Sequence, residues 1–154
     1  MSLPKIGTKA PAFSAPTQSG ETITLKSLLG RPVVLFFYPK DNTSGCTVEA
    51  CSFRDAYAEL KKVAHVLGVS PDPVKSHEKF ATKFTLPYPL LADTEKQIVT
   101  DYGVWVEKSM YGKKYMGVAR TTFLIDAKGK IARIFEKVKP EGHAEEVLAA
   151  VREL

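Results

Sequence analysis

The sequence has 154 residues, 44% hydrophobic and 25% charged, which excludes a disordered or fibrous protein and favours a single domain over residues 1–154. The longest apolar run, Val33 to Tyr38, is far shorter than the roughly 20 residues of a membrane helix, and no signal pattern opens the chain, so we expect a cytoplasmic protein without membrane contact. The formal charge is +5, but Lys and Arg are scattered in runs no longer than two, which argues against nucleic-acid binding.

The first strong pattern in the chain is a strand followed by a helix. Residues 32–38 are continuously apolar, β-branched or aromatic and end at Pro39, which predicts a strand buried on both faces at the centre of a sheet. A polar turn follows. Residues 45–63 then place apolar side chains near helical spacing and end in Lys61 and Lys62, which predicts a helix that begins close to Cys46.

The remaining elements continue this alternation. They are a strand at 65–70, a helix at 74–84, a short strand at 90–93, a helix near 95–102, strands at 120–126 and 130–136, and a helix at 143–154. The alternation of strands and helices predicts parallel strands with right-handed crossovers. The last two strands instead flank an Ala-Lys-Gly turn in which Gly129 can adopt positive φ, which predicts an antiparallel hairpin. The fold class is therefore α/β, with a central mixed β-sheet flanked by helices.

The two cysteines, Cys46 and Cys51, are separated by four residues. In a reducing cytosol such a pair indicates catalysis, redox chemistry or metal binding rather than a structural disulfide. Cys46 follows Thr43, Ser44 and Gly45, which are turn and N-cap types, so we expect it in the first helical turn, where free N–H groups and the helix dipole favour a thiolate. For one isolated cysteine, a small buried apolar side chain is an equally good interpretation.

The spacing has a geometric consequence. On an intact helix, five residues turn by about 500°, so Cys51 points roughly 140° away from Cys46. A disulfide needs Cα atoms within about 7 Å, so the two thiols can pair only if the first turn unwinds. A metal site is the competing hypothesis, but His65, His77 and His143 lie at no ligand spacing to the cysteines, so we expect no metal.

Residues 39–46, PKDNTSGC, match the P-x-x-x-T-x-x-C pattern of peroxiredoxins directly after an apolar strand. A second cysteine five positions later resembles the peroxiredoxin Q, or bacterioferritin-comigratory-protein, branch. The resemblance extends to G-x-x-A-P-x-F at 7–13, YGKKYMG at 111–117 and ARTTFLID at 119–126. It implies a thioredoxin-like fold and a thiol peroxidase without metal, haem, flavin or other cofactor.

The resemblance also implies roles for individual residues. Cys46 is the peroxidatic cysteine, Pro39 shapes the pocket, Thr43 offers its hydroxyl to the peroxide, and Arg120 brings a guanidinium to the thiolate. Oxidised Cys46 is a sulfenic acid that condenses with Cys51, the resolving cysteine, to a disulfide. An external dithiol then reopens it, and the family implies thioredoxin or a glutaredoxin-like protein. This branch is commonly monomeric.

Other assignments stay open at this point. Glu49 matches a family position that carries Glu or Gln and would hold Arg120, but an exposed glutamate favoured by the helix dipole explains it equally well. Trp105 and Tyr111 are candidates for the pocket border, although packing is the commoner role of aromatic residues. The same cysteine pair would also serve a peroxide sensor, whereas the absence of C-x-x-C argues against a disulfide reductase. Hydrogen peroxide and organic hydroperoxides are both possible substrates.

Overall fold

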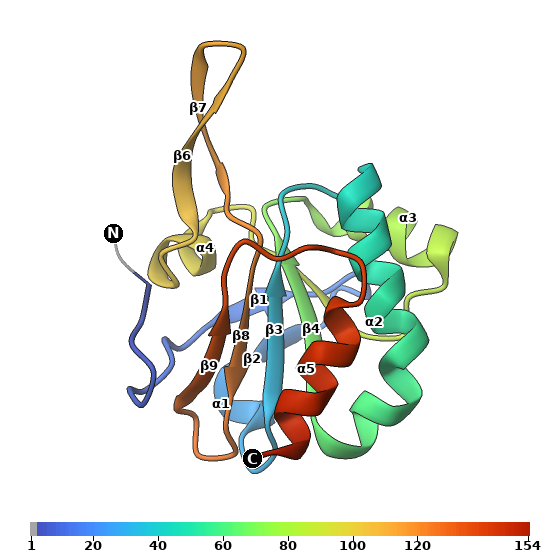
Figure 1. Ribbon diagram of the computed structural model, residues 1–154. Helices are drawn as coiled ribbons and strands as arrows, with labels where there is room; N and C mark the ends of the chain where they lie inside the picture. Colours follow the sequence, from blue (N-terminus) through green and yellow to red (C-terminus); the bar gives the residue numbers. More distant parts are fainter. Residues whose placement is uncertain (1–2) are drawn as a thin grey trace.

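A computed structural model of the chain describes residues 3–154 (Figure 1). Its elements are, in order, β1 (Ser14–Pro16), β2 (Thr22–Thr24), α1 (Leu25–Leu28), β3 (Val33–Phe37), α2 (Ser44–Val63), β4 (His65–Ser70), α3 (Val74–Phe84), β5 (Leu90–Ala92), α4 (Gln97–Asp101), β6 (Trp105–Met110), β7 (Lys113–Val118), β8 (Thr121–Ile125), β9 (Ile131–Phe135) and α5 (His143–Arg152). Within the described residues, no helix combines the length and apolar character that a membrane crossing requires.

The core of the molecule is a five-stranded sheet in the order β5-β4-β3-β8-β9. β3 runs parallel to β4, with Val33 opposite His65, and antiparallel to β8, with Val33 opposite Ile125. β4 and β5 are parallel, and β8 and β9 are antiparallel. The mixed sheet with its surrounding helices confirms the predicted fold class, and all five residues of β3 are buried, as expected of a central strand.

Helices cover both faces of this sheet (Figure 1). α2, α3 and α5 lie on one face, where Phe36 of β3 stacks on Phe53 of α2 with ring centroids 4.5 Å apart. The N-terminal segment, α1 and α4 cover the other face around Leu35, Phe37 and Tyr102. Alternate side chains of β3 thus enter two cores, so the loop that follows the strand starts from a rigid support.

The predicted boundaries agree with the observed elements to within a few residues. α2 begins at Ser44, one residue before the predicted start, and Gly129 has φ 91°, as the predicted hairpin turn requires. The 143–154 helix ends earlier, at Arg152. The two-stranded sheets β1–β2 and β6–β7 were not predicted. Both are short local pairings whose polar and apolar residues show no clear period.

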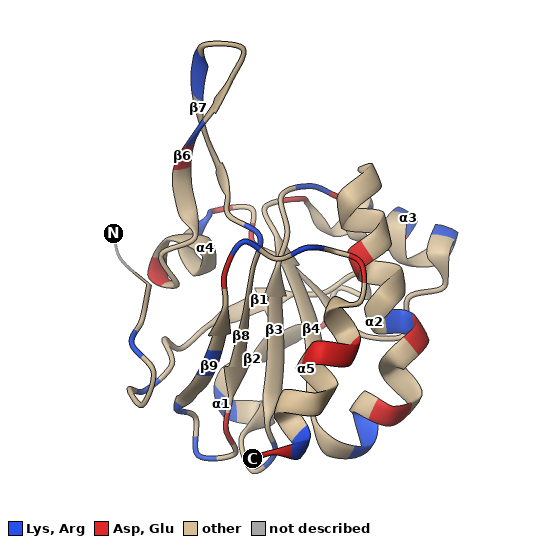
Figure 2. Ribbon diagram, in the orientation of Figure 1, with Lys and Arg blue, Asp and Glu red and all other residues tan. Residues whose placement is uncertain are grey.

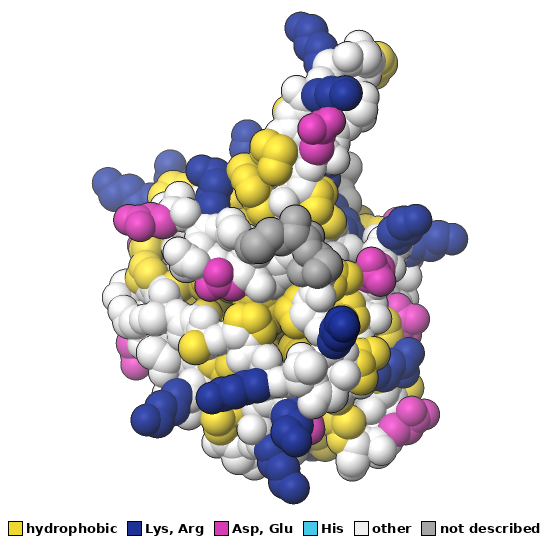
Figure 3. All heavy atoms as spheres, turned by 90° about the vertical axis from the view of Figure 1, so that its left-hand side faces the viewer, with side chains coloured by type: hydrophobic (Ala, Val, Ile, Leu, Met, Phe, Trp, Pro, Cys, Tyr) yellow, Lys and Arg dark blue, Asp and Glu magenta, His cyan; other side chains and the backbone are white. Residues whose placement is uncertain are grey.

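The β6–β7 hairpin projects from the body of the molecule (Figures 1 and 3). Tyr111 at its tip is 99% exposed, so the expectation that Tyr111 borders the pocket is wrong. Tyr111 and Gly112 both have positive φ, which matches a two-residue hairpin turn of type I′. Trp105 at the base packs against the apolar core and under Lys96, whose Nζ lies 5.6 Å from the ring centroid.

Basic and acidic residues are distributed over helices, strands and loops (Figure 2). This agrees with the scattered charge pattern of the sequence. The segment that joins β3 to α2 leads directly to Cys46, and it lies at the carboxyl end of the central strand.

Candidate active site

Cys46 lies in the first turn of α2 and is only 1% exposed. The first main-chain bond of the helix runs from Thr47 N to Thr43 O over 2.8 Å. The N–H groups of Ser44, Gly45 and Cys46 therefore have no acceptor within the helix. These donors and the positive end of the helix dipole surround the Cys46 sulfur, and its place in the first turn is the one that the sequence predicted.

Arg120, between β7 and β8, joins two acidic groups of α2. Its Nη2 donates to Cys46 Sγ at 3.3 Å, and its Nη1 donates to Glu49 Oε1 at 2.7 Å. Burial lowers the pKa of Arg120, but the negative charges of Glu49 and Cys46 outweigh that effect and raise it, so the guanidinium stays charged. The side chain is 19% exposed, which leaves this cation largely shielded from water.

Glu49 is fully buried, so the alternative of an exposed first-turn glutamate is wrong. Its Oε1 accepts from Arg120, whereas its Oε2 has no hydrogen-bond partner. Burial raises the pKa of Glu49 to about 7, although the charge of Arg120 and the hydrogen bond from it act in the opposite direction. The carboxyl group that shares Arg120 with Cys46 therefore changes charge near neutral pH.

Gly45 has a steric role that its turn propensity did not reveal. Its φ is not in the left-handed region, so backbone strain does not require a glycine here. A Cβ at this position would lie 3.2 Å from Arg120 Nη2 and 3.8 Å from Pro140 Cγ. The missing side chain leaves room for the guanidinium to lie against the start of the helix.

Thr43 and Pro39 form the entry to the helix. Thr43 is the N-cap residue, but its side chain makes no capping bond, and its Oγ1 donates instead to Lys40 O at 2.9 Å. The hydroxyl oxygen keeps its lone pairs as acceptors, while its proton is used within the loop. Pro39 is half-buried directly after Tyr38 and fixes the direction in which the chain leaves the sheet.

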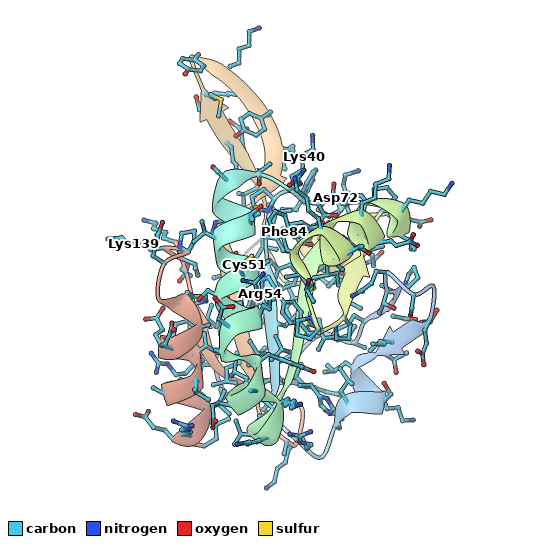
Figure 4. The ribbon with its side chains drawn as sticks, turned by 90° about the vertical axis from the view of Figure 1, so that its right-hand side faces the viewer. Lys40, Cys51, Arg54, Asp72, Phe84 and Lys139 are labelled. Atoms are coloured by element: carbon cyan, nitrogen blue, oxygen red, sulfur yellow. The ribbon has the colours of Figure 1, made fainter. Side chains whose placement is uncertain are left out.

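Cys51 lies on another side of the same helix, and both thiols are free. Figure 4 shows Cys51 and Arg54 on the side of α2 that is turned towards α3, near Phe84. Arg54 Nη1 donates to Phe84 O at 2.7 Å, and its Nε donates to Asp55 Oδ1 at 3.0 Å. The bond to Asp55 raises the pKa of Arg54, burial lowers it, and a negative charge on Cys51 raises it further.

Lys108 of β6 is a second cation near Cys46 that the sequence did not identify. Burial and the charge of Arg120 lower its pKa, and the charge of Cys46 raises it. Gly117 on the paired strand gives it space, since a Cβ there would lie 3.2 Å from Lys108 Cδ. Only the hairpin brings residue 108 to this place, and no motif in the sequence signals it.

One group outside this site has the composition of a metal centre. Asp41, Asp72 and His77 offer ligand atoms within 4.8 Å of one another. Both ring nitrogens of His77 already have protein partners, Asp41 Oδ2 at 2.7 Å and Leu91 O at 2.9 Å. A ring nitrogen that donates a proton has no lone pair for a metal, so this donor set does not fit one.

The chain resembles known proteins over nearly its whole length. Residues 6–134 match the AhpC/TSA family. A putative peroxiredoxin bcp of Coxiella burnetii is 50% identical, covering 94% of this chain and 96% of that protein, and peroxiredoxin Bcp of Escherichia coli is 45% identical, covering 97% and 96%. A crystal structure of a mutant PrxQ from Xylella fastidiosa superposes with a TM-score of 0.94 at 34% identity, covering 99% of this chain and 98% of that one.

Proposed function

The chain belongs to the AhpC/TSA family and is a peroxiredoxin of the Bcp type, and from this premise we propose that Cys46 is its peroxidatic cysteine. The observation that carries this proposal is the 3.3 Å contact from Arg120 Nη2 to Cys46 Sγ. A permanently charged guanidinium at this place stabilises the thiolate and faces the position where negative charge develops on the leaving oxygen. The free N–H groups of the first turn add to the same field.

The first chemical step is displacement at an O–O bond. The Cys46 thiolate attacks the terminal oxygen of a hydroperoxide, an S–O bond forms as the O–O bond breaks, and the leaving alkoxide or hydroxide takes up a proton to become an alcohol or water. Cysteine is oxidised to sulfenic acid and the peroxide is reduced. Thr43 Oγ1, with its own proton on Lys40 O, accepts a hydrogen bond from the bound peroxide, and Pro39 borders the pocket.

The second step joins the two cysteines. The Cys51 thiol attacks the sulfur of the Cys46 sulfenic acid, a disulfide forms, and water leaves. Because α2 is continuous through both residues, the first turn must unwind before the sulfurs meet. A dithiol protein, thioredoxin or a glutaredoxin-like protein, then takes the oxidising equivalents by thiol–disulfide exchange and restores both thiols.

Substrate and setting follow from the same site. A bacterioferritin comigratory protein of Xanthomonas campestris is described by its alkyl peroxide reduction activity. We infer that this chain reduces both hydrogen peroxide and organic hydroperoxides. One chain supplies both cysteines and Arg120, so a monomer suffices, and a cycle that depends on dithiols suits the reducing cytoplasm.

The deciding experiment measures peroxide consumption with thioredoxin, thioredoxin reductase and NADPH, together with the intact mass of each product. Cys46→Ser should abolish turnover. Cys51→Ser should still consume one equivalent of peroxide and accumulate a sulfenic acid that dimedone traps. Wild-type turnover in Cys46→Ser would refute the assignment of the nucleophile. If peroxide oxidised the wild-type protein but no dithiol protein supported repeated turnover, the result would favour a peroxide sensor over a peroxidase.

A further inference from the structure

The loop between β3 and α2, residues 39–43, is fastened through the side chain of Asp41. This residue is 7% exposed. Its Oδ1 accepts from Tyr38 Oη at 2.6 Å, and its Oδ2 accepts from Ser76 Oγ at 2.7 Å and lies 2.7 Å from His77 Nδ1. The backbone N–H of Asp41 donates to Asp72 Oδ2 at 2.8 Å. A single loop residue is thus bound to the end of β3, to the β4–α3 connection and to α3.

Both ring nitrogens of His77 have partners in the structure. Its Nε2 lies 2.9 Å from Leu91 O, and a carbonyl only accepts, so Nε2 donates this hydrogen bond. Its Nδ1 lies 2.7 Å from Asp41 Oδ2. His77 and Asp41 are both buried, so their side chains form a hydrogen-bonded pair that is shielded from water.

Asn42 makes a further contact beside this pair. It has φ 59°, in the left-handed region that asparagine adopts more readily than most residues other than glycine. Its Oδ1 accepts from Lys83 Nζ of α3 at 3.3 Å. This bond is a second connection between the loop and α3.

These anchors lie outside the element that moves. In the cycle proposed above, the first turn of α2 unwinds so that Cys46 reaches Cys51. The side-chain partners of Asp41 and Asn42 are Tyr38, directly after β3, and residues of the β4–α3 connection and of α3, while Leu91 belongs to β5. Unwinding the first turn of α2 therefore breaks none of these hydrogen bonds.

We propose that the buried Asp41–His77 pair is a positioning device that holds the 39–43 loop on α3 while the start of α2 unwinds and reforms. His77 acts on Cys46 only through the loop and does not contact the sulfur. Because the first helical turn is the costly part of helix formation, a fixed N-cap region lets α2 rewind in register after each reduction. This inference rests on the proposed peroxidase cycle.

The first test examines the pair without any catalysis. Two-bond ¹H–¹⁵N correlation spectra of the reduced protein at pH 7 report the protons on each histidine ring. We expect Nε2 of His77 to carry a proton in wild type, and the Nδ1 signal to move in Asp41→Asn, which keeps the shape but replaces the carboxyl group by an amide. An Nε2 without a proton in wild type, or an unchanged Nδ1 signal in Asp41→Asn, would overturn the Asp41–His77 pair.

The second test measures positioning. In the Cys51→Ser background, stopped-flow oxidation of Cys46 by hydrogen peroxide should slow roughly 10- to 100-fold in Asp41→Ala. Asp93→Ala is the matched control, because Asp93 is 4% exposed and holds the N–H groups of Ile98 and Val99 at the start of α4. The control should lose stability and keep the wild-type rate. If Cys46 oxidation slowed equally in both variants, the effect of Asp41 would be one of general stability and not of positioning.

Amide exchange of the oxidised protein provides the third test. We expect the amides of the first turn of α2 to exchange rapidly, whereas the Asp41 amide, bound to Asp72, stays protected. Loss of its protection together with that turn would overturn the proposal. If Cys46 failed to react with peroxide in every variant, the proposed function would be wrong. The ring spectra of His77 in the reduced protein do not depend on that reaction, so they would still test the Asp41–His77 pair.

Discussion

The surroundings of Cys46 and Cys51 differ although both thiols lie on one helix. At Cys46, which is 1% exposed, the nearby arginine points at the sulfur, with Arg120 Nη2 at 3.3 Å. At Cys51, which is half-buried, the nearby arginine is used elsewhere, since Arg54 donates to Phe84 O and Asp55. The residue type and the helix are shared, but only Cys46 lies in the first turn. The second difference is the direction of a guanidinium from another part of the fold, which contacts the sulfur of Cys46 and not that of Cys51.

In the proposed cycle, this difference orders the two chemical steps. Arg120 and Gly45 would act on Cys46 in the peroxide step while the helix is intact. Cys51 lies on another side of α2 and would meet the oxidised sulfur only after unwinding. Changes on the Arg120 side should therefore alter the peroxide step, and changes on the Arg54 side should alter the disulfide step.

The largest effect is expected at Arg120. Arg120→Ala should slow oxidation of Cys46 by hydrogen peroxide about 100- to 1000-fold, because it removes a fixed cation from the sulfur and the leaving oxygen. Stopped-flow measurement in the Cys51→Ser background isolates this step. Arg54→Ala is the matched control and should keep the wild-type rate. Similar rates in Arg120→Ala and wild type would remove the contrast between the two sites.

Glu49→Gln tests, through pH, the charge of the carboxyl group on the Cys46 side of α2. The folded protein holds the Glu49 proton to a pKa of about 7, against the ordinary value of 4.5, so this group favours folding below pH 4.5 and the contribution is lost as pH rises towards 7. A shift of this size corresponds to roughly 3 kcal/mol. Urea unfolding across this range should show a steeper loss of stability in wild type than in Glu49→Gln. Parallel curves would contradict the raised pKa.

Gly45→Ala tests whether the position of Arg120 matters as well as its charge. The added Cβ would lie 3.2 Å from Nη2, so the guanidinium must shift away from the sulfur. We expect Cys46 oxidation to slow by roughly 10-fold with little change in stability, since φ at this glycine is not left-handed and alanine favours helix. A rate as slow as that of Arg120→Ala would indicate that the guanidinium had left the site altogether.

The smallest effect is expected at Arg54. Arg54→Ala removes the bond from α2 to Phe84 O and a positive charge near Cys51, so we expect a change of only a few-fold in the rate of disulfide formation after one equivalent of peroxide. Intact mass in a quenched-flow series follows the sulfenic acid and the disulfide separately. A change in the peroxide step instead would show that the two sides of α2 are not independent.

The local pattern of the chain predicted the main elements well. The apolar run before Pro39 gave the central strand, the turn residues before Cys46 gave the helix start, and Gly129 marked the final hairpin. These features depend on period, capping and backbone freedom, which act over a few residues. The β6–β7 hairpin was not predicted because its exposed strands lack a buried face, so their polar and apolar residues do not alternate.

Local patterns in the sequence were enough to place Cys46 at the start of a helix after a buried strand, and to place Cys51 on another side of that helix. The packing of distant segments buries Glu49, sets Arg120 against Gly45, brings Lys108 near Cys46 and joins Asp41 to His77. Periodicity and capping are properties of neighbours along the chain. Desolvation and the direction of a charged group depend on segments that the sheet brings together from far along the chain, as the 36-residue span of Asp41 and His77 and the 71-residue span of Glu49 and Arg120 illustrate.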